Sequence, residues 1–150
     1  ALPIFANGTL TDSFCLDYQA GMESAMMLAT AALSGVNLSG VYMEGANLIG
    51  VDLSYADLSY ADLSYARLWH ADLSYADLSY ATLWFTNLDE TNLSYATLGG
   101  TDLTGANLTH ATADPDPYTD SNTNWYDTIC PNGSVVTGTG GLLCAFPDPP

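Results

Sequence analysis

The sequence predicts an all-β solenoid, and two regularities lead to that prediction. From residue 31 to residue 110 the chain repeats every five positions, through sixteen blocks without insertion or deletion, as in VDLSYADLSYADLSY. A period of five fits neither the 3.6-residue period of a helix nor the alternation of an ordinary strand. Each block is centred on Leu, or on Met43 in one case, with only Ala, Val or Thr two positions earlier. If each block forms one side of a square coil, the large residue fills the interior and the small one lets the corner close, so four blocks make one turn.

The other three positions of each block are expected to face solvent. They hold mostly Asp or Asn, then Ser or Thr, then Tyr or Gly. Residues 20 apart should lie above one another at about 4.8 Å, the spacing of paired strands, so that like residues form columns. Aromatic rings at that spacing can stack, and exposed apolar area on this scale usually marks a surface that meets a partner. The expected interaction surface contains Tyr55, Tyr75 and Tyr95 in one column, Tyr60 and Tyr80 in a second, and Tyr65 and Phe85 in a third, with Trp69 and Trp84 also facing outward.

These blocks resemble the pentapeptide-repeat family, whose pattern is a small residue, Asp or Asn, Leu, and two variable residues. The resemblance covers 80 of the 150 residues. It implies a right-handed quadrilateral β-helix of about four to five coils. It implies little about activity, because such families share a fold rather than a function. A coiled coil is the alternative architecture, but five is not a coiled-coil period.

The chain divides into three segments. Residues 1–30 lack the repeat and are interpreted as an N-terminal cap or assembly segment, in which the stretch from Leu16 predicts a short amphipathic helix over the first coil. Residues 31–110 form the predicted β-helix. Residues 111–150 are expected to form a C-terminal cap that starts with a turn-rich stretch and uses Trp125 and Tyr126 as packing anchors.

Three cysteines allow one internal disulfide. Cys130 and Cys144 bracket a Gly-rich loop, and a disulfide between them is favoured because it would hold the ends of that loop together, contributing about 3 kcal/mol. Cys15 is then left over. An intermolecular bond, an alternative pairing with either C-terminal cysteine, and a free thiol all remain open for it.

Charge and composition limit the partners and the setting. The chain has 17 acidic residues and a single base, Arg67, so Coulomb repulsion disfavours binding to nucleic acid or anionic lipid. No apolar run approaches 18 residues, so membrane insertion is not expected. The chain begins at Ala1 rather than at an initiator Met, which favours a processed product whose signal peptide has been removed. We therefore expect an extracellular or cell-surface location.

Acidic columns raise the question of a bound cation. Like charges about 5 Å apart should repel each other unless a cation intervenes, and calcium could bridge them through carboxylate and hydroxyl oxygens. The favoured interpretation is nevertheless a solvated acidic face without a cofactor. The carboxylates concerned are Asp52 above Asp72 and Asp57 above Asp77.

The fourth side carries Gly50, His70, Glu90 and His110 at its corner position. The two imidazoles should lie about 10 Å apart, too far to share one ion at bond lengths near 2 Å. A local hydrogen bond between His and Glu is expected instead. No nucleophile stands in a recognisable catalytic context, so the sequence does not predict an enzyme.

Three classes of function are consistent with the sequence. The favoured one is a secreted structural protein that self-associates into a filament or surface assembly, since β-solenoids expose backbone edges and this one also exposes aromatic sides. The second is a module that binds carbohydrate or another surface ligand through Tyr and Trp. The third is an acidic mimic of DNA that binds a type II topoisomerase, as some relatives of the resembled family do.

Overall fold

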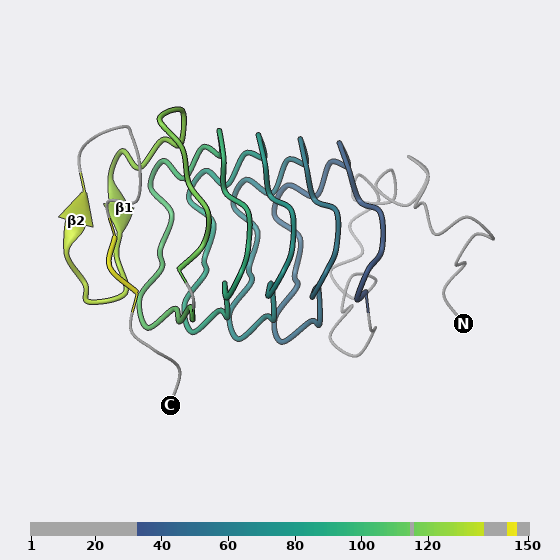
Figure 1. Ribbon diagram of the computed structural model, residues 1–150, viewed down its shortest axis with the longest axis horizontal. Helices are drawn as coiled ribbons and strands as arrows, with labels where there is room; N and C mark the ends of the chain where they lie inside the picture. Colours follow the sequence, from purple (N-terminus) through teal and green to yellow (C-terminus); the bar gives the residue numbers. More distant parts are fainter. Residues whose placement is uncertain (1–32, 115, 137–143, 147–150) are drawn as a thin grey trace.

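The computed structural model describes residues 33–114, 116–136 and 144–146, and these residues form the predicted solenoid. Figure 1 shows the coils side by side along the axis of the rod, with the strands β1 and β2 at its C-terminal end. The helix predicted within residues 1–30, and Cys15 with it, lie outside the described residues. Within the described part, no helix is long and apolar enough to cross a membrane.

Backbone pairing between coils sets the rise of the rod. Parallel bridges join residues 20 apart, and a single vertical row links Asn37, Asp57, Asp77, Thr97 and Tyr118. The described chain therefore contains five coils. Between neighbouring coils, the amide of Leu53 donates to the carbonyl of Asp72 at 2.8 Å, and the same bond recurs at the other sides. These bonds confirm that one turn takes four blocks.

Each corner is closed by a residue in the left-handed region of the backbone. All sixteen residues that end a block, from Gly35 to His110, have φ between 52° and 69°. A hydrogen bond closes the same turn, as where the amide of Ala76 donates to the carbonyl of Leu73 at 3.0 Å. A positive φ at the third residue of such a turn is the signature of a type II β-turn, which Gly occupies without strain. The corner thus depends on the last position of the block as well as on the small residue that follows it.

The interior is a stack of leucines lined by small residues. The central residues from Leu38 to Leu108 are almost completely buried, as are the Ala and Thr residues two positions earlier. Where Thr replaces Ala, its hydroxyl donates to a leucine carbonyl of the preceding coil, for example from Thr86 to Leu63 at 2.7 Å. Such a bond satisfies a hydroxyl that would be costly to bury alone. Thr is therefore compatible with the narrow interior.

The coil continues beyond residue 110, where the sequence predicts that the C-terminal cap begins. Asn92 bridges Thr112, and Asn107 bridges Ile129, so residues 112–129 follow the path of one more turn. The spacing grows from 20 to 22 residues in this coil, which interrupts the pentapeptide pattern. Trp125 occupies the position of a central leucine and is fully buried. Tyr126, the next residue, points outward and is exposed, so its expected role as a packing anchor is wrong.

An antiparallel hairpin ends the described solenoid. Strand β1 (Thr128–Ile129) pairs with β2 (Val135–Val136) in the register Thr128 with Val136 and Ile129 with Val135. A disulfide joins Cys130 to Cys144, the pairing that the sequence favoured, and both cysteines are buried. Ile129 thus pairs in parallel with the preceding coil through Asn107, and its other edge pairs in the antiparallel sense with β2.

The leucine stack can be tested in the middle of the rod. We expect Leu78→Ala to lower the free energy of unfolding by about 2 to 5 kcal/mol, because the rigid coils above and below cannot collapse into the cavity. Urea denaturation followed by circular dichroism measures the change. The neighbouring surface variant Ser79→Ala should change stability by less than about 0.5 kcal/mol. Equal losses in the two variants would contradict the central role of the leucine.

Candidate functional site

Three aromatic columns run along the corners of the rod. In the first, the rings of Tyr55 and Tyr75 are 4.6 Å apart at 4°, and those of Tyr75 and Tyr95 are 4.4 Å apart at 7°. The second column stacks Tyr60 on Tyr80 at 5.1 Å. The third stacks Tyr65 on Phe85 at 5.5 Å. The spacing of the coils therefore brings together each ring pair that the sequence predicted.

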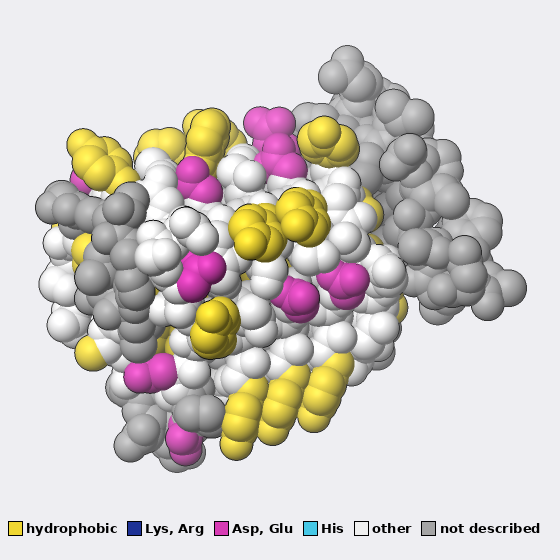
Figure 2. Space-filling model, turned by 45° about the horizontal axis from the view of Figure 1, so that its top comes forward, with side chains coloured by type: hydrophobic (Ala, Val, Ile, Leu, Met, Phe, Trp, Pro, Cys, Tyr) yellow, Lys and Arg dark blue, Asp and Glu magenta, His cyan; other side chains and the backbone are white. Residues whose placement is uncertain are grey.

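The columns are exposed as well as ordered. The nine aromatic side chains predicted to face outward are between 39% (Trp69) and 65% (Tyr60) exposed. Figure 2 shows yellow side chains stacked in rows, with white and magenta surface between the rows. Loss of solvent contact between the flanking rings, followed by the charges of Tyr95 and Tyr55, raises the pKa of Tyr75. The hydroxyl of Tyr75 therefore stays protonated at neutral pH.

Two of the columns end on glycine. A Cβ added to Gly100 would lie 2.6 Å from the Tyr80 ring, and one added to Gly105 would lie 2.5 Å from the Phe85 ring. Each ring thus lies directly over the backbone of the next coil. A side chain at either corner would therefore displace the ring above it, and the glycine marks the lower end of each column.

The acidic rows are organised by local hydrogen bonds. Asp52 lies above Asp72 and Asp57 above Asp77, as predicted. Each carboxylate accepts a hydrogen bond from the amide two residues later, as from Ser54 to Asp52 at 3.0 Å. The group of metal-ligating side chains that lie close together in the described residues does not include these four aspartates. The prediction for these aspartates stays a solvated acidic face, with bridging by calcium as the untested alternative.

Hydrogen bonding also changes the acidity of these carboxyl groups. Partial burial of Asp102 opposes its ionisation, but hydrogen bonds from Thr104, Trp84 and Asn124 outweigh burial and lower the pKa of that carboxyl. The hydroxyl and amide of Ser54 lower the pKa of Asp52 in the same way. These carboxylates are therefore ionised at neutral pH and serve as acceptors that hold the turns.

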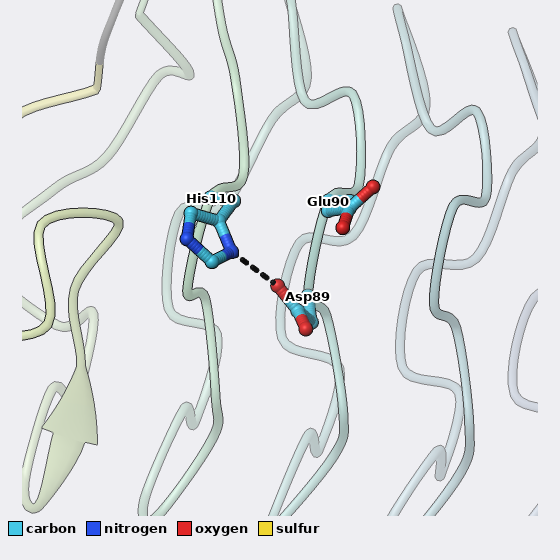
Figure 3. Close-up of side chains that lie close together, drawn as sticks. All are labelled: Asp89, Glu90 and His110. Atoms are coloured by element: carbon cyan, nitrogen blue, oxygen red, sulfur yellow. Dashed lines mark hydrogen bonds and ion pairs between the residues drawn. The ribbon is translucent and has the colours of Figure 1, made fainter.

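The fourth corner carries ionisable groups in place of rings. His70 Nδ1 lies 3.0 Å from Glu90 Oε2, which confirms the expected contact between His and Glu. His110 pairs instead with Asp89, at 3.1 Å from Nδ1 to Oδ1 (Figure 3). Asp89, Glu90 and His110 each offer a ligand atom within 4.8 Å of the others. We call these three residues the carboxylate–histidine corner.

Sequence reasoning missed Asp89 as a member of this corner. A column relates residues 20 apart, whereas Asp89 and His110 are 21 apart and meet diagonally across two coils. A signal was nevertheless present, because Asp89 is an Asp at a block position that otherwise holds mostly Ser or Thr. Departures from the repeat therefore identify the residues that need a separate explanation.

Comparisons with known proteins agree with this architecture. The family model for pentapeptide repeats matches eight copies, over residues 31–69, 52–83 and 71–109. No curated protein matches the chain. Among solved structures, the pentapeptide repeat protein Rfr23 from the cyanobacterium Cyanothece 51142 is 35% identical over 71% of this chain and 69% of its own, with a TM-score of 0.63.

Two further solved structures are similar. A pentapeptide repeat protein from the Arabidopsis thaliana thylakoid lumen is 27% identical over 75% of each chain, with a TM-score of 0.61. Another from Nostoc PCC 7120 is 34% identical over 75% of this chain and 81% of its own, with a TM-score of 0.56. The similarity therefore extends over most of the chain.

The packing of a ring over glycine gives a matched pair of variants. Gly50 and Gly105 have φ of 66° and 67°, but a Cβ on Gly50 would meet nothing within 4 Å. We expect Gly50→Ala to lower the free energy of unfolding by about 1 kcal/mol through left-handed strain alone. Gly105→Ala should cost roughly 1 kcal/mol more, because the Phe85 ring must move. Thermal and urea unfolding measure both, and equal losses would mean that the ring does not rest on Gly105.

The lowered pKa of Asp102 predicts a pH dependence. A carboxyl whose pKa is lower in the folded state stabilises the fold above its unfolded pKa of about 4, and this stabilisation is lost as the pH falls through the folded value. Wild-type protein should therefore be more stable than Asp102→Asn at pH 6, and the difference should shrink below about pH 4. Urea unfolding at several pH values measures it. A difference that stayed constant with pH would contradict the role of the charge.

Proposed function

The chain belongs to the pentapeptide repeat family of right-handed quadrilateral β-helices, and from that architecture and its surface we propose that it is a non-enzymatic structural protein that self-associates through its aromatic columns. We propose that it does so outside the cell, in a filament or surface assembly. The observation that carries this proposal is the stacked and exposed column of Tyr55, Tyr75 and Tyr95.

Within a single copy of the chain, the aromatic columns cost more free energy in backbone strain than ring stacking returns. A residue other than Gly in the left-handed region costs roughly 1 to 2 kcal/mol, and a stacked pair of rings contributes about 0.5 to 1.5 kcal/mol. Tyr55, Tyr75 and Tyr95 occupy three such corners and form two stacked pairs. Stacking therefore offsets only part of the strain, whereas the glycines at Gly35 and Gly50 avoid it. Rings at the central corners are thus better explained by what they contact outside the chain.

The columns are also suited to meeting a second copy. Their rings are held parallel within 4° to 12° by the neighbouring coils, so little side-chain freedom remains to be lost on binding. Two identical rods can place the same column of each against the other, as in a two-fold symmetric interface. Aromatic residues are enriched at the centres of such interfaces. Self-association therefore needs no feature beyond those already on the surface.

Contact through the sides is favoured over contact through the C-terminal end. Parallel stacking of rods end to end would require free backbone groups along the last coil. At β1 that edge is already paired with β2 in the antiparallel sense, and the disulfide of Cys130 and Cys144 closes the segment that follows. Covering an edge in this way is a known means of preventing strand addition.

The net charge sets a condition on assembly. Copies with a formal charge of −16 repel one another, and this repulsion is screened over about 10 Å at 0.1 M salt. Contact between neutral rings should therefore strengthen as the salt concentration rises. The internal disulfide supports an oxidising extracellular setting.

Carbohydrate binding is a second candidate, because flat exposed rings can also pack against sugar rings. Trp84 is exposed beside the columns, and Trp69 packs against His70 with 4.2 Å between ring centroids. Glycan-array binding that is lost in Trp84→Ala but unchanged in Tyr75→Gly would favour this candidate. It would also separate the tryptophans from the tyrosine column.

Self-association can be tested by removing one column. The triple variant Tyr55→Gly, Tyr75→Gly and Tyr95→Gly places at each corner the residue that suits its positive φ, so the fold should remain at least as stable. Analytical ultracentrifugation at 0.05 M and 0.5 M NaCl should give oligomers for the wild type, more so at the higher salt, and monomers for the variant. Electron microscopy of the same samples tests for regular filaments.

The control is Tyr118→Ser, which removes an exposed tyrosine outside the stacked columns. It should assemble as the wild type does. A wild type that stays monomeric at millimolar concentration and high salt, or a triple variant that assembles normally, would rule out the proposal.

A further inference from the structure

We propose that the carboxylate–histidine corner is a binding site for a divalent transition-metal ion, with Asp89, Glu90 and His110 as its ligands. The site lies on the corner that carries no stacked aromatic column, so it is independent of the proposed self-association. It also differs from the rows of aspartates, which contain no nitrogen ligand.

The ligand atoms are nearly in position. A tetrahedral ion with bonds of about 2.1 Å places its ligand atoms about 3.4 Å apart. His110 Nδ1 and Asp89 Oδ1 are already 3.1 Å apart, and all three ligand atoms lie within 4.8 Å of one another. Side-chain rotation of Glu90 can supply the remaining movement, because its side chain is 40% exposed and that of His110 is 69% exposed. Figure 3 shows the imidazole of His110 and the Asp89 carboxylate facing each other across two neighbouring coils, with Glu90 on the same coil as Asp89.

The backbone beneath the site is fixed. The amide of Glu90 donates to the carbonyl of Thr109, the amide of His110 donates to the carbonyl of Pro131, and the amide of Asp89 donates to the side chain of Asn87. Glu90 and His110 are both corner residues with φ of 56°. The ladder thus holds the three Cα atoms in place before any ion binds, and only side-chain torsions have to change. Such a preformed arrangement lowers the cost of binding.

The neighbouring His70 supports the same arrangement from the coil above. Its Nδ1 lies 3.0 Å from Glu90 Oε2, which leaves the other carboxylate oxygen of Glu90 available to an ion, and its ring packs against Trp69. Hydrogen bonds of this kind orient metal ligands and raise their affinity. His70 is thus a positioning residue rather than a ligand.

The ligand set indicates the type of ion. Calcium and magnesium prefer oxygen ligands, whereas an imidazole with carboxylates suits Zn²⁺, Cu²⁺ and Ni²⁺. Three protein ligands leave room for water or for a group of another molecule. The acidic surface, with a formal charge of −16, also attracts cations toward the site.

Isothermal titration calorimetry with Zn²⁺ tests the site in full-length protein without a histidine tag. All samples carry Cys15→Ser, because a thiol could bind zinc by itself. We expect one ion per chain, and we expect Asp89→Ser and His110→Gln each to lower the affinity at least about tenfold. Circular dichroism melting curves confirm that these surface variants stay folded.

Two controls distinguish binding of the ion at these three residues from general attraction of cations to the acidic surface. Asp57→Asn removes a carboxylate of a stacked acidic pair and should leave zinc affinity unchanged. In electron paramagnetic resonance with Cu²⁺, the nitrogen hyperfine signal should persist in His70→Gln and disappear in His110→Gln, since the chain has only these two histidines. The proposal is overturned if wild-type protein does not bind Zn²⁺, if Asp57→Asn weakens binding as much as Asp89→Ser, or if the nitrogen signal depends on His70.

Discussion

The left-handed residue that ends every block is the constraint on which the rest of the molecule depends. It turns the chain onto the next side of the coil within a few residues, so that five residues suffice for one side, and its amide still donates to the next coil, as from Tyr55 to Ser74 at 2.9 Å. Because every corner uses the same conformation, each block begins in the same orientation. The leucines therefore all point inward, and equivalent residues 20 apart lie above one another.

The same constraint separates the fold from its surface chemistry. Interior leucines and small residues specify the coil, whereas the corner tolerates Gly, Tyr, Phe, His or Glu at nearly the same φ. A corner column can thus change its chemistry without changing the path of the chain. On this rod three corners carry stacked rings and the fourth carries histidines and carboxylates, so two kinds of surface coexist on one scaffold.

Periodicity explains both what could be predicted from the sequence and what could not. The period of five placed the leucines inside and paired Tyr55 with Tyr75, because those relations repeat at a fixed separation. The period carries no information on backbone torsions, although the recurrent Gly at the last block position was an indication of positive φ. It also fails where two extra residues enter the last coil, which hid the equivalence of Trp125 to a leucine. The contact between Asp89 and His110 was not predicted for a similar reason, since the two residues meet diagonally rather than within a column.

When identical side chains lie above one another on successive coils, aromatic rings attract each other whereas charged groups repel each other. The polar rows reflect that difference. Asp72 lies above Asn92, whose amide donates to it at 3.2 Å, and Asp102 receives a hydrogen bond from Asn124 of the next coil at 3.1 Å. Asn and Thr thus interrupt most of the acidic rows and turn repulsion into hydrogen bonding. At the fourth corner the opposite arrangement occurs, because two adjacent acids, Asp89 and Glu90, lie between two histidines. In the acidic rows, Asn or Thr follows after at most two aspartates, whereas this corner places two adjacent carboxylates beside histidines, an arrangement that suits a cation.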